Sequence, residues 1–366
     1  MAFRTFPELT EAWRNSVHGE KLRAVRRAAL SVREKMLNDG TVQALSTCPL
    51  ITLPYPSLFA FSGAALSPAP YILMTNRMNV VQFIDPEGQL RTLLFNPSDV
   101  DRNEKTPFYA NLKARYGNFL SHKVMSTRHA TVQEHLERLG LTPDDVDYIA
   151  FDHLHIQDVR GWIGADGIPG VFPRAKLIID RAEWNITKDL HPMQYVWYCP
   201  NGTAGVDESR VMFIENDLWL GRGVALIRTP GHTQGNMSLA VNTDRGLFVI
   251  SENGVSTEQY SPLQSAIAGV RSTAEQLGHE VILNGNTREG SLDQYTSMVL
   301  EKTLAGPCKV DPSYVNFYPS SELTQSLLAP GLSPTFSHGD LSQGEIRRVN
   351  QARSAALNGH RNEVRA

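Results

Sequence analysis

The chain has 366 residues, of which 41% are hydrophobic and 20% charged, and its formal net charge is −3. This length suits one large domain with appendages, and the composition permits a sizeable core. The small net charge gives no electrostatic reason to expect a nucleic-acid partner, and no apolar run reaches the roughly eighteen residues of a transmembrane helix.

The cysteines and the N-terminus indicate the cellular compartment. Cys48, Cys199 and Cys308 lie far apart in the sequence and have no metal-binding spacing. An odd number of separated cysteines favours a reducing compartment. The first eight residues also lack the apolar core of a signal peptide. We therefore expect a cytoplasmic protein that does not associate with membranes.

The N-terminal segment has a helical pattern. Apolar residues recur every three to four positions between residues 8 and 38, which predicts an amphipathic helix. Acidic residues are mixed with the basic ones, so the polar face is expected to be solvated rather than bound to a membrane. We assign residues 1–50 to a helical extension that packs either on the main domain or on a second subunit of a homodimer.

The next segments alternate between strands and helices. Residues 52–96 contain short apolar stretches typical of strands, with a hairpin signal at 85–88. Residues 101–128 are polar with scattered aromatic residues, and we expect an irregular insertion. Residues 130–140 predict a helix closed by glycine, followed by a buried strand over 148–151. A helix leading into a strand is typical of an α/β layer.

Two histidines follow that strand with a spacing suited to a metal. His153 and His155 are two positions apart, and side chains two apart on an extended chain project to the same side. Such a pair either shares a metal ion or consists of polar residues satisfied at a strand end. Three later segments also place a polar residue in a glycine-containing turn after an apolar strand, at His232, Glu252 and Asn286.

The order and spacing of these segments resemble the metallo-β-lactamase-fold hydrolase superfamily over residues 70–305. The family's motifs are His-x-His-x-Asp-His, a Gly-His, a Gly-Asp and a final Gly-His. The resemblance implies an α/β protein with an αββα sandwich, in which two mixed β-sheets are flanked by helices. We accordingly assign residues 51–305 to the metallo-β-lactamase-like domain and residues 306–366 to a C-terminal extension.

The resemblance also implies a set of metal ligands. The family's ligands to one metal are all present, at His153, His155 and His232. The positions that serve the second metal are altered, and they hold Gln157, Asp158, Glu252 and Asn286. Because two imidazoles of the second site are lost, we expect one tightly bound divalent ion. Zn²⁺ suits three imidazoles and a water, with Fe²⁺ or Mn²⁺ as alternatives.

Each altered residue has an expected role. Glu252 would be a fourth ligand or a general base, and Asp158 would orient a ligand histidine, bind a weak second metal or act as the base. Gln157 and Asn286 are neutral amides that would donate hydrogen bonds to a substrate oxygen. Tyr195 lies in an aromatic segment that we predict to line the substrate pocket, although core packing or a dimer contact would explain the same composition.

These expectations lead to one principal function and two alternatives. A metal-activated water would make the protein a hydrolase of a small-molecule ester, lactone or thioester. The superfamily also includes oxygenases with a single iron, so a mononuclear iron oxygenase is the first alternative. The altered second site favours the other alternative, a non-catalytic member that keeps the fold as a binding or assembly module.

Overall fold

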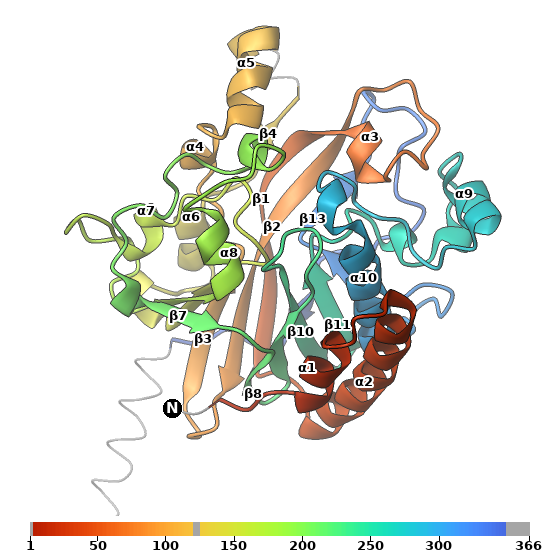
Figure 1. Cartoon of the computed structure of the whole chain (residues 1–366). Helices are drawn as coiled ribbons and strands as arrows, with labels where there is room; N and C mark the ends of the chain where they lie inside the picture. Colours follow the sequence, from red (N-terminus) through yellow and green to blue (C-terminus); the bar gives the residue numbers. More distant parts are fainter. Residues whose placement is uncertain (1–2, 120–124, 349–366) are drawn as a thin grey trace, which may run out of the picture.

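The computed structural model describes residues 3–119 and 125–348 of the chain. Two β-sheets face each other at its centre, and helices cover the outer faces (Figure 1). This arrangement is the expected αββα sandwich. None of the described helices has the length and apolar character needed to cross a bilayer.

Over the described residues, the larger sheet is mixed and has nine strands. Its main order is β14-β1-β2-β3-β5-β6-β7, with β13 also paired to β2 and β4 to β1. The strands are β1 (Ala44–Pro56), β2 (Tyr71–Ile84), β3 (Leu90–Phe95), β4 (Thr127–Arg128), β5 (Tyr148–Ala150), β6 (Lys176–Asp180), β7 (Val211–Ile214), β13 (Ser321–Thr324) and β14 (Ser342–Gln343). The pairs from β1 to β3 are antiparallel, whereas those from β3 through β5 and β6 to β7 are parallel.

In the described part of the chain, the smaller sheet has five strands in the order β12-β11-β10-β9-β8. They are β8 (Leu218–Gly221), β9 (Val224–Arg228), β10 (Met237–Thr243), β11 (Gly246–Ser251) and β12 (Phe317–Pro319). All of its pairs are antiparallel except β11 with β12, so this sheet is mixed as well. Because β9 and β11 both run antiparallel to β10, their carboxyl ends lie at the same edge of the sheet.

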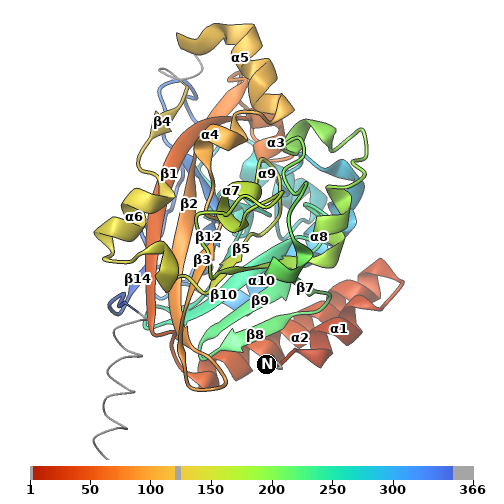
Figure 2. The ribbon, with the colours of Figure 1, turned by 90° about the vertical axis from the view of Figure 1, so that its left-hand side faces the viewer.

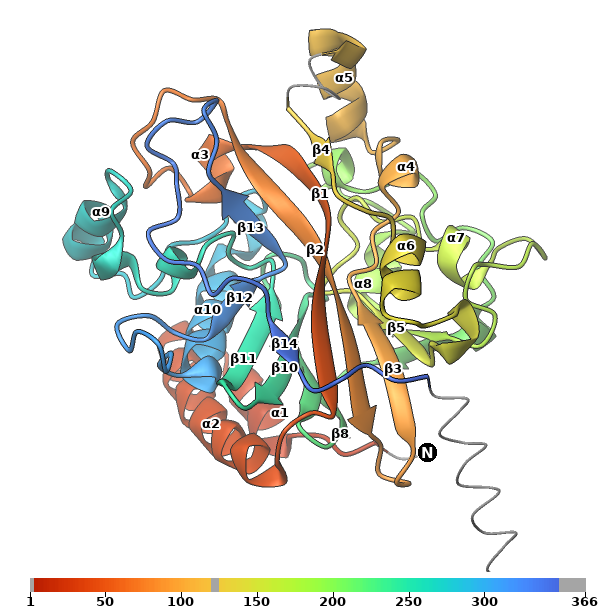
Figure 3. The ribbon, with the colours of Figure 1, turned by 180° about the vertical axis from the view of Figure 1, so that it is seen from behind.

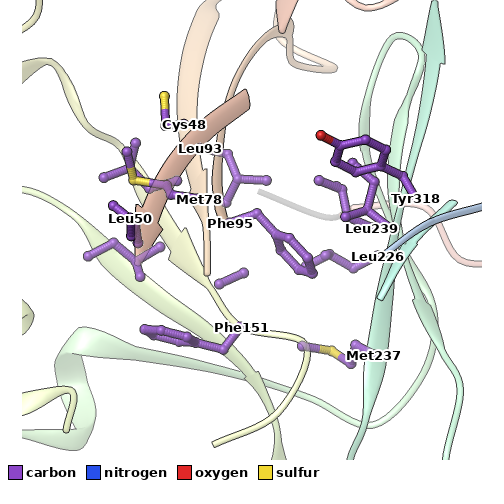
Figure 4. Packing of buried hydrophobic residues seen from close by; sticks show 14 of the residues in the cluster. Cys48, Leu50, Met78, Leu93, Phe95, Phe151, Leu226, Met237, Leu239 and Tyr318 are labelled. Carbon is purple, nitrogen blue, oxygen red and sulfur yellow. The ribbon is translucent and has the colours of Figure 1, made fainter. Parts of the chain in front are cut away.

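The main core lies between the two sheets. Phe95 of the larger sheet faces Leu226 and Leu239 of the smaller one (Figure 4). Neighbouring residues such as Ile227 and Ala240 belong instead to a second apolar cluster, which includes residues of the N-terminal helices. This division follows from the alternation of side chains along a strand, which gives the small sheet two apolar faces.

Helices cover both outer faces. The described α-helices are α1 (Pro7–Trp13), α2 (His18–Asp39), α3 (Ser57–Ala60), α4 (Val100–Asn103), α5 (Pro107–Phe119), α6 (Val132–Arg138), α7 (Arg160–Ile163), α8 (Arg181–Ile186), α9 (Val270–Leu277) and α10 (Ser291–Ala305). Short 3₁₀ turns are η2 (Pro143–Asp145), η3 (Tyr195–Trp197), η4 (Glu208–Arg210), η5 (Thr257–Gln259), η6 (Pro262–Gln264) and η7 (Arg288–Gly290). Helices α1, α2 and α10 lie against the smaller sheet, and α6 packs on β1 of the larger one (Figures 2 and 3).

Two sequence expectations meet different outcomes in this region. The helix expected over 130–140 is present as α6, where Thr131 and Glu134 form a reciprocal capping box. The segment 101–128 differs from the irregular insertion that we expected, because it contains most of α4 and all of α5. Many of the described side chains of α5 are exposed, and their polar character led us to expect irregular structure there.

The terminal segments are integral layers of the sandwich. Helix α2 packs along α10, and Lys21 donates to Asp293 at 3.0 Å. Strand β1 continues across residue 50, and β12 to β14 follow residue 305. The domain boundaries at residues 50 and 305 stay predictions. The part of the predicted C-terminal extension beyond residue 348 lies outside the described residues.

Candidate metal centre

The candidate ligands follow strands from both sheets. His153 and His155 come directly after β5, His232 follows β9, and Glu252 follows β11. The turn after β9 packs closely against α10, since a Cβ on Gly231 would lie 2.0 Å from the backbone nitrogen of Gln294. Strand ends from two facing sheets thereby meet at one edge of the sandwich. Side chains that are distant in the sequence converge there.

The three histidines form one buried cluster. Their ring centroids are 4.6 Å apart for His153 and His155, 4.5 Å for His153 and His232, and 5.1 Å for His155 and His232. One nitrogen from each ring lies within 4.8 Å of the others. The three residues are 4%, 6% and 1% exposed. The structure therefore brings together the ligand set that the sequence predicted for the first metal.

Several ring nitrogens in the cluster are unpartnered. Nε2 of His155 and both ring nitrogens of His232 are buried without a hydrogen-bond partner in the described parts of the chain. Burial, reinforced by the charge on His153, holds the pKa of both imidazoles well below the usual value, so both are neutral. Unsatisfied polar atoms are unfavourable in an interior, and neutral imidazoles with free lone pairs are metal ligands. These residues therefore fit a divalent metal ion.

His153 has a partner that the sequence analysis did not assign. Asp152 accepts a hydrogen bond from Nδ1 of His153 at 2.8 Å. Burial disfavours the charged imidazole, but the carboxylate of Asp152 outweighs this effect and raises the pKa of His153 to about 9. Because Nδ1 is occupied, Nε2 is the nitrogen of His153 that remains for an ion. The position of Asp152 before the His-x-His motif was its only sequence signal.

Glu252 also lies at the centre. One oxygen of its carboxylate lies within 4.8 Å of ligand atoms of Asp152 and His153. Ser321 Oγ donates to its Oε2 at 3.1 Å, and burial raises its pKa to about 7. This second cluster shares His153 with the first, so it extends the same centre. Its position is compatible with both predicted roles, ligand and base, which stay predictions.

Asp158 lies apart from both clusters and is paired with arginine. Its Oδ1 accepts from Arg160 Nε at 2.8 Å, and its Oδ2 accepts from Arg160 Nη2 at 2.6 Å. Arg102 adds a longer contact of 3.5 Å. Burial alone would raise the pKa of Asp158, but the hydrogen bonds and charge of Arg160 hold it below the usual value. Both oxygens of the Asp158 carboxylate thus accept hydrogen bonds from arginine guanidinium groups.

The predicted substrate-binding residues occupy three different settings. Gln157 donates from Nε2 to Ser98 Oγ at 2.8 Å, and its Oε1 is buried without a partner in the described residues. Asn286 is partly exposed, and its Oδ1 is likewise buried and unpartnered within that part of the chain. Tyr195 is 56% exposed on η3. The buried aromatic residue of η3 is Trp197, whose ring centroid is 6.3 Å from that of His155.

Glu183 is a further residue that sequence reasoning missed. It is fully buried, and its Oε1 accepts from the backbone N–H of Leu154 at 2.8 Å and from Tyr198 OH at 2.9 Å. Its Oε2 accepts from Thr233 Oγ1 at 2.5 Å. One carboxylate thus joins the His-x-His segment to the turn that carries His232. No motif marked it, because its partners are distant in the sequence.

An apolar pocket opens beside the histidine cluster. The space inside it that a water-sized sphere can reach is about 70 Å³, which is below the usual size range of ligand pockets, and the pocket is partly open to solvent. Its apolar lining comes from β1, α4, α5 and the residue after His155, and it includes Ile51, Leu53, Val100, Tyr109, Leu112 and Ile156. Ile156 directly follows His155 in the sequence, so the pocket lies near the histidine cluster.

Comparison with known proteins found related sequences over about a third of the chain. An N-acyl homoserine lactonase from Bacillus sp is 31% identical over 133 residues, covering 35% of this chain and 47% of the relative. An N-acyl homoserine lactonase from Bacillus cereus is 30% identical over 140 residues, covering 37% and 50%. The chain spans about half the length of the curated relatives it matches. No protein-family model matches the chain.

Comparison with solved structures found similar chains. AidC, a dizinc quorum-quenching lactonase, has a TM-score of 0.49 and 14% identity, covering 84% of this chain and 96% of that one. An N-acyl homoserine lactone hydrolase with bound N-hexanoyl-L-homoserine has a TM-score of 0.43 and 21% identity, covering 65% and 88%. Three features identify the fold of this chain. They are the two facing mixed sheets, the histidine cluster at the strand ends and the sequence relatives.

The chain has the metallo-β-lactamase fold. The resemblance that the motifs indicated is thereby confirmed, together with the sandwich architecture. Within this metallo-β-lactamase fold, the positions of one metal site retain histidines. Asp158, at a position of the altered second site, forms an ion pair with Arg160 instead.

Proposed function

We propose that the protein is a metal-dependent hydrolase that cleaves the ester bond of a lactone or a related small-molecule ester. The observation that carries this proposal is the buried cluster of three imidazoles with unpartnered ring nitrogens. A divalent ion bound there would lower the pKa of a coordinated water toward about 7 and so supply a hydroxide nucleophile near neutral pH.

The residues around the cluster have separate tasks in this proposal. His153, His155 and His232 hold the ion, and their burial keeps bulk water away from the ligand nitrogens. Glu252 places a carboxylate oxygen at the same centre, where it either completes the coordination or accepts a proton from the attacking water. Gln157 and Asn286 are neutral amides and suit hydrogen bonding to a substrate oxygen, as the sequence analysis predicted.

The substrate class is inferred from the pocket and the relatives together. The pocket beside His155 is mainly apolar, so it suits an acyl or alkyl group attached to the reacting ester. The curated relatives are named N-acyl homoserine lactonases, whose substrates combine a lactone ring with an acyl chain. We therefore propose a lactone with an apolar substituent as the substrate.

The same proposal includes a single bound ion. Two observations support this number: the first cluster has three imidazoles, whereas Asp158 is paired with Arg160. We propose Zn²⁺, since zinc suits three nitrogen ligands with a position left for water, and Fe²⁺ or Mn²⁺ remain the alternatives. A homodimer and a cytoplasmic location also stay predictions.

The test combines metal analysis with a lactonase assay. Protein purified without added metal would be analysed for zinc, iron and manganese, and hydrolysis of N-acyl homoserine lactones would be followed by proton release. His153→Ala, His155→Ala and His232→Ala should each remove most bound metal and lower kcat/KM by at least about a hundredfold, because each removes one of three ligands.

His279→Ala is the matched control, since His279 is exposed on the surface and contacts the ring of Tyr295. It should keep the metal content and activity of the unmodified protein. Stoichiometric iron with oxygen consumption would replace the hydrolase by an oxygenase. Unchanged metal content and activity in all three cluster variants would leave only the non-catalytic alternative.

A further inference from the structure

Asn96 has an unusual backbone conformation next to the metal centre. It follows the last residue of β3 and is 3% exposed, and its φ of 58° lies in the left-handed region. Few residues other than glycine adopt this region, and asparagine is among those that tolerate it best. A buried left-handed residue needs support from its surroundings. The backbone N–H of Asn96 donates to Ala150 O at 2.8 Å.

The amide of Asn96 fixes Asp152 with two complementary hydrogen bonds. Asn96 Nδ2 donates to Asp152 Oδ2 at 3.0 Å, and the backbone N–H of Asp152 donates to Asn96 Oδ1 at 2.9 Å. The amide of Asn96 thus supplies one donor and one acceptor, which pair with the carboxylate and the backbone N–H of Asp152. This geometry determines which carboxylate oxygen faces Asn96 and which one remains for another partner.

The remaining oxygen of Asp152 faces His153. Oδ1 accepts from the backbone N–H of His153 at 2.9 Å and from ring Nδ1 at 2.8 Å. A carboxylate in this position keeps a proton on Nδ1, which leaves Nε2 as the nitrogen that would bind an ion after losing its own proton. In metal sites, such a partner holds the ring orientation and makes the ligand nitrogen a stronger electron donor.

We propose that Asn96 and Asp152 are positioning residues that set the tautomer and orientation of His153 for metal binding. This inference rests on the proposed function, since it presumes that the histidine cluster holds an ion. The resemblance assigned a role to neither residue. Both are buried, and the chain of hydrogen bonds runs from the end of β3 to the first ligand after β5.

The key variant is Asp152→Asn. The new amide has one oxygen and one nitrogen, whereas Asn96 Nδ2 and His153 Nδ1 both donate to this side chain. In either orientation one donor therefore faces another donor. The double variant Asn96→Asp with Asp152→Asn restores complementary donors and acceptors along the chain, while it moves the negative charge away from His153.

Two measurements would be made on the full chain. The Zn²⁺ dissociation constant would be determined by competition with a chromophoric chelator, and the His153 tautomer by ¹⁵N NMR of histidine-labelled protein. Asp152→Asn should weaken Zn²⁺ binding by about 10–100-fold and reduce the Nδ1-protonated form, since partners of ligand histidines contribute effects of this size. The double variant should recover the tautomer and most of the affinity.

Asn201→Asp is the matched control for the substitution at Asn96. Asn201 also has a left-handed φ, of 57°, but it is exposed in a surface turn. It should leave both measurements unchanged. If Asp152→Asn alone does not fold, the double variant decides, because the inference requires an Nδ1-protonated His153 in it.

The possible failures are distinguishable. If the unmodified protein takes up no divalent ion, the proposed function fails and this inference fails with it. If the unmodified protein binds Zn²⁺ but Asp152→Asn binds it equally well, only the positioning role is overturned. Weak binding by Asp152→Asn without any recovery in the double variant would also overturn it, because hydrogen-bond complementarity would then be irrelevant.

Discussion

Arg160 binds both carboxylate oxygens of Asp158, at 2.8 Å through Nε and 2.6 Å through Nη2. The Asp158 side chain is fully buried, while that of Arg160 is 26% exposed. A two-pronged pair of this kind is geometrically specific, and it occupies the oxygens that a metal would need. In this structure Asp158 therefore stabilises the segment after the His-x-His motif through its ion pair with Arg160.

Asp158→Asn should leave the metal content unchanged and lower stability. The change leaves Arg160 without its charged partner, and we expect the free energy of unfolding to fall by about 1–3 kcal/mol. Elemental analysis and urea unfolding would measure the two effects. Asp189→Asn, at an exposed position, is the control. A folded Asp158→Asn protein that has lost its metal would restore Asp158 as a ligand.

Glu183→Gln should weaken both the fold and metal binding. The amide can accept fewer hydrogen bonds than the carboxylate that now receives Leu154 N–H, Tyr198 OH and Thr233 Oγ1. Hydrogen bonds to a charged group contribute about 1.5–3 kcal/mol, so we expect a loss of that order in the metal-free protein. Because Glu183 joins both ligand segments, Zn²⁺ affinity should fall as well.

Urea unfolding without metal and chelator competition with Zn²⁺ would separate these effects of Glu183→Gln. Glu34→Gln, on the exposed face of α2, should change neither quantity. A variant that loses stability but keeps full Zn²⁺ affinity would show that Glu183 supports the fold alone.

Leu112→Ala should alter the preference for acyl chain length. Leu112 is 6% exposed, and its side chain lines the apolar pocket from α5. Apolar contacts in a pocket discriminate by roughly tenfold or more, so KM for a decanoyl lactone should rise about tenfold, with a smaller change for a butanoyl lactone. Steady-state kinetics on both substrates would measure this. Leu277→Ala, at an exposed position, is the control. If Leu112→Ala changed KM equally for the two lactones, or if Leu277→Ala changed KM as much, the acyl chain would bind outside this pocket.

Glu301 should make stability depend on pH. It is fully buried, and burial raises its pKa from 4.5 to about 7, although hydrogen bonds from Ser238, Tyr260 and Asn253 oppose this shift. The folded state therefore retains a proton that the unfolded chain loses between pH 4.5 and 7. The contribution of Glu301 to the free energy of unfolding is therefore fully present below this pH window, and it is lost as the pH rises through the window.

The matching variant is Glu301→Gln, which cannot titrate. The difference in unfolding free energy between the unmodified protein and this variant should change by on the order of 3 kcal/mol across that pH window. Urea unfolding of both proteins at several pH values would measure it. A difference that does not vary with pH would contradict the raised pKa of Glu301.

Local sequence patterns determined much of the centre. A spacing of two after an apolar strand placed His153 and His155 on one side, because side-chain direction on an extended chain depends on nearby residues alone. The resemblance to the metallo-β-lactamase-fold superfamily, carried in part by the Thr-Pro-Gly-His turn after a strand, then implied His232 as the third ligand. Gly140 marked the end of the helix over 130–140 for the same reason, since a helix C-terminal cap involves only neighbouring residues.

The tertiary structure alone decided the partners of these residues. Asn96 and Asp152 meet because β3 and β5 pair in parallel, and Glu183 reaches Thr233 across the two ligand segments. The assignment of Asp158 to Arg160 also depended on where the carboxylate points, which its sequence position does not specify. Strand pairing and side-chain orientation are set by packing between distant parts of the chain, so a local pattern identifies the ligands but not the network that holds them.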